Sequence, residues 1–402
     1  MGELTATEQA LVERAAAAPM LAQVERWAAI NSGSANLAGL KDMAGVLADA
    51  FAAFPGELRL AEPTPVTAVD SSGAERTVGH GHHLHLAVRP SAPVQLLFTG
   101  HMDTVYPADH PFKQLHWRED GVLNGPGVAD MKGGLAVMLA ALQAIETSPL
   151  GPTVGYEVVI NSDEEVGSPA SAALLAAAAA NKRAALTYEP SALPDGTLAG
   201  ARPGSGNFSF VVTGRSAHAG RNPQDGRNAV VAAADLALRL TALIEPGLTV
   251  NVARMDGGGP NNVVPERAVL RVNLRPATPE LQAKADAAIA AAVREVAAAH
   301  DLAIHRHGGF GRPPKPMTPA LEALFGLVAK AGADLDQPIR WQPSGGVCDG
   351  NNIAACGVPV VDTMGVRGGA IHSPEEYLIV ASLAERAALS ALTIARLAGE
   401  AA

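Results

Sequence analysis

Histidine and carboxylate residues follow four apolar segments of this sequence, each at the point where the segment ends. The segments are 94–99, 156–160, 184–188 and 358–364, and they are followed by His101 and Asp103, by Glu164 and Glu165, by Glu189 and, across a loop, by His372. A further carboxylate, Asp130, lies in the glycine-rich segment 125–134. Imidazole and carboxylate ligands in this number suit borderline cations such as zinc.

Two cations that share one carboxylate can polarise a carbonyl group and lower the pKa of a water molecule. A hydrolase built this way also needs a base that is not a metal ligand. The adjacent Glu164 and Glu165 offer one, since neighbours on an irregular turn can point in different directions. Asp103, two residues beyond His101, suits a carboxylate that orients the imidazole. Each feature alone is ordinary surface or turn chemistry, but together at the ends of successive strands they favour a metal-dependent hydrolase.

The elements that must position these residues alternate between strands and helices in the first half of the chain. Strands separated by helices of this length indicate a mostly parallel sheet covered by helices, with its ligands outside the carboxyl ends of the strands. The apolar patterns predict strands at 84–88, 94–99, 156–161 and 184–188, and helices at 135–146 and 170–182.

The pattern changes near residue 204, where a strand–helix–strand–strand–helix–strand order begins. The predicted elements are 207–213, 228–243, 248–254, 268–274, 279–300 and 303–307. This order is that of a small split sandwich with both helices on one face. We therefore predict that residues 204–311 are inserted into one discontinuous domain formed by 1–203 and 312–402. The last part returns to a strand at 358–364 and a long helix from Leu378.

Composition limits the partners of the protein. A net charge of −10 argues against nucleic-acid or anionic-membrane partners, because both bind positively charged protein surfaces. No apolar segment of the sequence is long enough to predict a membrane span. The two cysteines, Cys348 and Cys356, are too few for a disulfide framework, and the first twenty residues read as an amphipathic helix. We expect free thiols and a cytoplasmic protein, or a periplasmic one if an export signal has been removed.

Several motifs resemble the zinc-dependent exopeptidase and deacylase family that includes carboxypeptidase G, acetylornithine deacetylase, succinyl-diaminopimelate desuccinylase and aminoacylase. The resemblance covers essentially the whole chain, with the motifs in the expected order. The matching stretches are 99–105, 125–134, 163–168, 187–190, 213–220, 261–265, 344–351 and 370–373.

This resemblance implies roles for the candidate residues. His101, Asp130 and Glu189 would bind one ion, and Asp130, Glu165 and His372 the other, with Asp130 bridging. The ions would be zinc, with cobalt or manganese as alternatives. Glu164 would be the general base and later the proton donor, and Asp103 would orient His101. The peptide bond Asp130–Met131 would be cis.

The resemblance also implies a phosphorylase/hydrolase-like α/β fold with an inserted ferredoxin-like α+β dimerisation or lid domain. In a homodimer, His218 would reach the partner's site to stabilise the oxyanion, assisted by Asn262. Arg312 would bind the substrate carboxylate, with Arg275 as an alternative. Gly346 lies in a loop that shapes the substrate pocket. The sequence departs from the family at Cys348, where a small or hydroxyl residue is expected.

Two other features carry no functional prediction. His80, His82, His83 and His85 form a histidine-rich tract, but they precede or alternate with strand residues without a nearby carboxylate, so we expect them to be solvated. The segment 257–259 lacks the remainder of a phosphate-binding loop and reads as a flexible turn.

The sequence thus predicts a carboxypeptidase G-like enzyme that cleaves the amide bond of a peptidyl- or N-acyl-amino acid with a free carboxylate. A biosynthetic deacylase acting on acetylornithine or succinyl-diaminopimelate is the alternative. A catalytically silent binding protein of the same fold is a more remote one.

Overall fold

The computed structural model describes residues 4–119 and 121–399, and its centre is a six-stranded sheet. We call it the main sheet. Its order is β1 (Gly56–Ala61), β4 (His83–Val88), β8 (Val154–Asn161), β5 (Val94–His101), β9 (Ala184–Thr187) and β16 (Val360–Val361). Strands β8, β5, β9 and β16 are parallel, whereas β4 runs opposite to both of its neighbours. The predicted mostly parallel sheet is confirmed.

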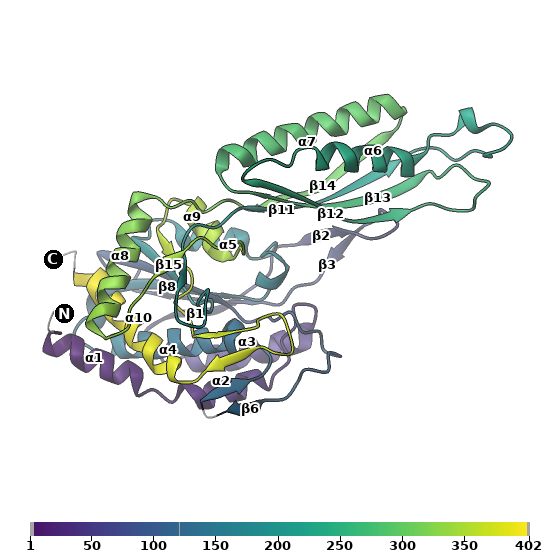
Figure 1. The fold of residues 1–402 in the computed structure, drawn as a ribbon. Coiled ribbons are helices and arrows are strands. Elements are labelled where there is room, and N and C mark those ends of the chain that lie inside the picture. Colours follow the sequence, from purple (N-terminus) through teal and green to yellow (C-terminus); the bar gives the residue numbers. More distant parts are fainter. Residues whose placement is uncertain (1–3, 120, 400–402) are drawn as a thin grey trace.

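Helices cover both faces of the main sheet (Figure 1). One face joins the larger apolar core with α1 (Ala6–Ala16), α2 (Met20–Ala28), α3 (Leu37–Phe51), α4 (Gly134–Glu146), α8 (Pro319–Asp334) and α10 (Ala381–Gly399). The other face packs against α5 (Ala172–Ala179) and α9 (Asp349–Ala355). Burial on both faces explains why these strands read as nearly continuous apolar runs.

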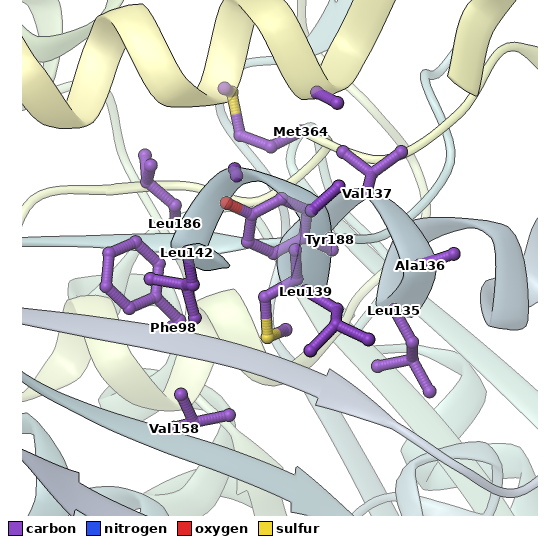
Figure 2. Packing of buried hydrophobic residues seen from close by; sticks show 14 of the residues in the cluster. Phe98, Leu135, Ala136, Val137, Leu139, Leu142, Val158, Leu186, Tyr188 and Met364 are labelled. Carbon is purple, nitrogen blue, oxygen red and sulfur yellow. The ribbon is translucent and has the colours of Figure 1, made fainter. Parts of the chain in front are cut away.

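The larger apolar core includes Tyr188, which directly precedes the candidate ligand Glu189. Figure 2 shows Tyr188 packed among Leu139 and Leu142 of α4, Phe98 and Leu186 of the sheet, and Met364. The segment Val128–Glu146 is long and apolar enough to cross a membrane, but 94% of it is buried inside the protein. We interpret it as a core helix, because its apolar surface is already covered.

A second sheet extends away from this body with two helices on one face (Figure 1). Its antiparallel order is β12 (Leu248–Gly257), β13 (Arg267–Pro276), β11 (Ser205–Thr213) and β14 (Ala303–Arg312). Helices α6 (Ala229–Thr241) and α7 (Pro279–His300) share an apolar core with it. The strand and helix order predicted from residue 207 onward is the order observed.

Several short strands escaped prediction. β2 (Val66–Val69) and β3 (Glu75–Val78) form a hairpin, and β10 (Leu198–Ala199) pairs with β15 (Trp341–Gln342). A small sheet contains β17 (Gly368–Gly369), β18 (Tyr377–Ile379), β7 (Val122–Asn124) and β6 (His116–Glu119). The last helix begins at Ala381, not at Leu378, because Tyr377–Ile379 pairs with β7 as a strand.

The prediction that the histidine tract is solvated is wrong. His83 is completely buried, and its Nδ1 accepts a hydrogen bond of 3.3 Å from the Ser162 amide. His85 lies with its Nε2 2.6 Å from a Glu157 oxygen, and even the more exposed His82 contacts Glu62. The reason is that β4 is an interior strand flanked by β1 and β8, so the neighbouring strand supplies a carboxylate that is distant in sequence.

Candidate metal centre

Adjacent parallel strands bring the candidate ligands to one edge of the main sheet. His101 is the last residue of β5, Glu164 and Glu165 form the turn after β8, and Glu189 follows β9. Asp130 lies just before α4. The second histidine, His372, comes from the loop between β17 and β18 and has a positive φ of 62°. A non-glycine residue in this conformation needs support from its surroundings, which is common at functional sites.

The two carboxylate oxygens of Asp130 face different histidines. Oδ1 lies 3.0 Å from His101 Nε2, and Oδ2 lies 3.3 Å from His372 Nε2. Glu189 approaches His101 Nε2 at 3.7 Å, and Glu165 approaches His372 Nε2 at 3.2 Å. The result is two trios of potential ligands that share Asp130. The peptide bond after it, Asp130–Met131, is cis, as predicted.

Asp103 holds the turn that carries the two glutamates. Its carboxylate accepts hydrogen bonds of 3.1 Å from the amides of both Glu164 and Glu165, and one of 2.7 Å from the Ser34 hydroxyl. His101 Nδ1 lies 2.9 Å from the Asp103 carbonyl oxygen and 3.4 Å from its carboxylate. The main chain of Asp103 therefore contacts the imidazole more closely than its side chain does, and the carboxylate positions the turn.

Sequence reasoning missed Glu376, which holds the loop of Asp130. Its carboxylate accepts hydrogen bonds of 3.0–3.1 Å from the amides of Gly127, Ala129 and Asp130, and one of 2.9 Å from the Tyr106 hydroxyl. Burial and the nearby Asp130 charge raise the pKa of Glu376 to about 7. Only its position four residues after His372, beside another glutamate, signalled it in the sequence.

Two glycines close to Asp130, Gly133 and Gly134, leave room for neighbouring protein backbone. A Cβ atom on Gly134 would lie 1.9 Å from the Tyr188 carbonyl oxygen, and one on Gly133 would lie 2.5 Å from that of Val128. Glycine thus allows the start of α4 to pack closely against the strand end that delivers Glu189.

Glu164 is bound by an arginine, although its carboxylate also lies close to the ligand atoms of His101 and Glu189. Its Oε1 accepts a hydrogen bond of 2.7 Å from Arg312, whose guanidinium also contacts Asp349 at 3.0 Å and Ser168 at 3.2 Å. The Arg312 residue is only 4% exposed. Both terminal nitrogens of Arg312 are therefore hydrogen-bonded to protein groups, and its role in binding a substrate carboxylate stays a prediction.

The site is rich in buried negative charge. Burial and neighbouring carboxylates raise the pKa of Glu165 to about 7 and raise the pKa values of Glu164 and Glu189 as well. The facing carboxylates raise the pKa of His372 to about 11. Carboxylates gathered in this way require compensating positive charge. The donor set of imidazole nitrogens and carboxylate oxygens fits divalent cations of the zinc class.

A cavity of about 250 Å³ opens beside these ligands. Its far wall is held by a buried ion cluster in which Asp362 accepts two hydrogen bonds of 2.8–2.9 Å from Arg202 and lies 2.6 Å from Lys315. Arg202 also donates to the Gly346 carbonyl at 3.1 Å, which fixes the loop predicted to shape the pocket. Cys348 lines this cavity as a buried free thiol, whereas Cys356 is free and exposed.

Of the other predicted residues, Gly346 lines the cavity beside the ligands, and Gly346 and Arg275 both line an adjoining cavity of about 830 Å³ that also contacts Glu164 and Glu165. His218 and Asn262 lie side by side beyond the second sheet, joined through the hydrogen bond from the Ala219 amide to the Asn262 carbonyl. Both are exposed, and neither lines the cavities around the ligands described here. His218 Nδ1 accepts from the amides of residues 220 and 221, which leaves the ring proton on the outward Nε2.

Fold and site together define an α/β protein with a metal-ligand set at the carboxyl edge of its sheet. The chain belongs to Peptidase family M20/M25/M40, whose sequence model matches residues 97–396. It is 30% identical to carboxypeptidase G2 of Pseudomonas sp. over 74% of this chain and 73% of that protein. It is 32% identical to a succinyl-diaminopimelate desuccinylase of Xanthomonas campestris over 76% and 84% of the respective chains. The protein is accordingly a hydrolase that acts on amide bonds.

Solved structures share the fold at low sequence identity. An M20 family metallo-carboxypeptidase from Sulfolobus solfataricus gives a TM-score of 0.71 at 16% identity and covers 95% of this chain and 99% of its own. A tripeptidase from Staphylococcus aureus gives 0.70 at 22% identity, over 99% and 100%. A dinuclear metal binding peptidase of the same family from Bacillus subtilis gives 0.63 at 14% identity, over 96% and 99%.

Proposed function

We propose that this protein is a two-metal hydrolase that cleaves the amide bond of a peptidyl- or N-acyl-amino acid bearing a free carboxylate. The observation that carries this proposal is that Asp130 presents one oxygen to His101 and the other to His372, while Glu164 is bound by Arg312. We assign His101, Asp130 and Glu189 to one ion and Asp130, Glu165 and His372 to the other. Zinc is the proposed metal. When bound, the cations would polarise the scissile carbonyl and make the attacking water more acidic.

Glu164 is the proposed general base and proton donor. It accepts a proton from the attacking water and later returns it to the departing amine. Arg312 supports this role because its positive charge favours the ionised carboxylate, against the burial that raises the pKa of Glu164. The Asp103 carboxylate fixes the Glu164 amide, so the base stays in place while it changes charge.

We assign recognition of the substrate carboxylate to Arg275 and not to Arg312. Arg275 is half-buried and lines the cavity next to Glu164, and among the residues that the structure describes it donates only to the main chain of Gly345 and to Asn273. It therefore keeps donors for an anion, whereas both terminal nitrogens of Arg312 already contact carboxylates.

We further propose that residues 204–311 form a ferredoxin-like dimerisation or lid domain, and that the protein is a homodimer. His218 and Asn262 lie outside the cavities of their own chain, and the proton on His218 Nε2 is available for a hydrogen bond. In the dimer, this N–H group would enter the cavity of the partner subunit and stabilise a developing oxyanion there.

A substrate panel tests the proposed function. Metal-reconstituted protein should hydrolyse N-acyl-amino acids or dipeptides with a free carboxylate and lose activity when that carboxylate is amidated. Hydrolysis confined to N-acetylornithine or N-succinyl-diaminopimelate would instead favour the biosynthetic deacylase, which the desuccinylase relatives also support. Failure on every amide with metal bound would favour a binding protein.

A further inference from the structure

The β2–β3 hairpin is attached to the second sheet. The Val69 carbonyl accepts a hydrogen bond of 3.0 Å from Arg271, and Thr67 contacts His307 Nε2 at 3.2 Å. Val69 also packs with Val211 and Val269 in a small apolar cluster. Figure 1 shows the hairpin alongside the strands of the second sheet. The hairpin therefore bridges the main body and the second sheet and closes one side of the space between them.

A cavity of about 820 Å³ lies in that space. Its apolar wall includes Leu37, Val78 and Val166, which are 47%, 39% and 52% exposed respectively. Large apolar side chains exposed together indicate a binding surface more often than a solvated one. The volume is within the range of about 300–1,000 Å³ that is typical of ligand pockets.

The polar residues of this cavity offer little to a polar ligand. Arg271 and His307 are engaged by the hairpin, and the Asn273 amide donates to Ser205 and Asn207. His80 is the exception, because its ring nitrogens have no hydrogen-bond partner among the described residues. The cavity therefore suits a mainly apolar occupant.

The cavity adjoins the candidate metal centre. Val166, Pro169, Asn207, Asn273 and Gly308 line both this cavity and the one that contains Glu164, Glu165 and Arg275. Val166 directly follows Glu165 in the chain, so the apolar wall begins next to a proposed metal ligand. A group that extends from the scissile amide towards the second sheet would enter it.

We propose that this cavity, lined by the β2–β3 hairpin and the second sheet, receives a large apolar group of the substrate. The group is the acyl chain or the side chain that flanks the amide on this side. This inference rests on the proposed function and narrows it to substrates with a long-chain or aromatic substituent.

Calorimetry on metal-free protein tests the inference without turnover. The ligands are N-acetylglycine, N-hexanoylglycine and N-octanoylglycine, together with N-acetylalanine and N-acetylphenylalanine for the side-chain arm. In one of the two series, affinity should rise with apolar size, about three- to fourfold for each added methylene in the acyl series. Equal affinity across both series would overturn the inference.

Val78→Glu places a charge in the cavity wall, and Val231→Glu is the matched control. Val231 is 52% exposed on α6, away from the hairpin. Val78→Glu should weaken binding of the larger ligand at least tenfold while leaving N-acetylglycine unchanged, and Val231→Glu should change neither. Equal effects of the two variants, or equal weakening of small and large ligands by Val78→Glu, would contradict the inference. Loss of the proposed function would appear separately, as absent hydrolysis by metal-loaded protein despite size-dependent binding.

Discussion

Replacing Glu376 by glutamine tests whether this buried carboxylate organises the loop of Asp130. In the structure, Oε1 accepts the amides of Ala129 and Asp130, and Oε2 accepts the Gly127 amide and the Tyr106 hydroxyl. A glutamine has one acceptor oxygen, and its best orientation keeps the first two bonds and turns its NH₂ group towards the Gly127 amide.

The expected cost follows from these contacts. One buried donor left without its acceptor costs about 1–3 kcal/mol, and loss of the negative charge weakens the remaining bonds. We therefore expect Glu376→Gln to lower the free energy of unfolding by about 2–4 kcal/mol. The pKa of Glu376 is raised to about 7, so the comparison belongs at pH 8, where the carboxylate is ionised. Zinc affinity should also fall about tenfold to a hundredfold.

Glu375 provides a matched control one residue away. Its side chain is 73% exposed and pairs with Arg118 at the surface, so Glu375→Gln should change stability by less than about 0.5 kcal/mol. Urea denaturation of metal-free protein measures both variants, and zinc titration measures affinity. The reasoning is refuted if the two variants lose the same stability, or if Glu376→Gln stays within about 0.5 kcal/mol of the wild type.

Three further predictions concern other buried charges. Glu164→Gln should retain metal but lower kcat by about 10²-fold or more, as measured with saturating substrate; near-normal kcat would remove Glu164 from the base role. Asp362→Asn leaves Arg202 and Lys315 without their buried partner and should cost about 3–5 kcal/mol in urea denaturation, and partial recovery in the double variant with Lys315→Met would identify the unpaired charge as the cause. Burial opposes ionisation of Glu157, but hydrogen bonds from His85 and Lys182 outweigh it and lower its pKa below the usual 4.5. The ionised group therefore stabilises the fold above that pH and loses this contribution on acidification. Glu157→Gln should accordingly show a smaller loss of stability than the wild type between pH 5 and pH 3. The same loss of stability in both proteins over this pH range would count against the pairing.

The sequence was most informative where strands deliver polar residues. The apolar runs before His101, Glu164 and Glu189 are buried on both faces, so their ends were visible as abrupt changes from apolar to polar residues. Parallel pairing of β8, β5 and β9 then makes these ends neighbours. The strand and helix order from residue 207 onward was readable for the same reason, since its elements are regular and amphipathic.

Contacts between distant segments could not be read from the sequence. The partner of Arg312 is Glu164, 148 residues away, and the role of Glu376 depends on amides about 246–249 residues earlier in the chain. His83 and His85 looked solvated because their burial is imposed by neighbouring strands. The β2–β3 hairpin is short and largely exposed, so its apolar pattern was too weak to predict a strand pair.

The central claim is that the two trios sharing Asp130 hold two cations. Elemental analysis of zinc-reconstituted protein after removal of free metal measures this directly. The account predicts about two zinc ions per chain. A value near zero would contradict the metal centre itself, and a value near one would contradict the bridging role of Asp130.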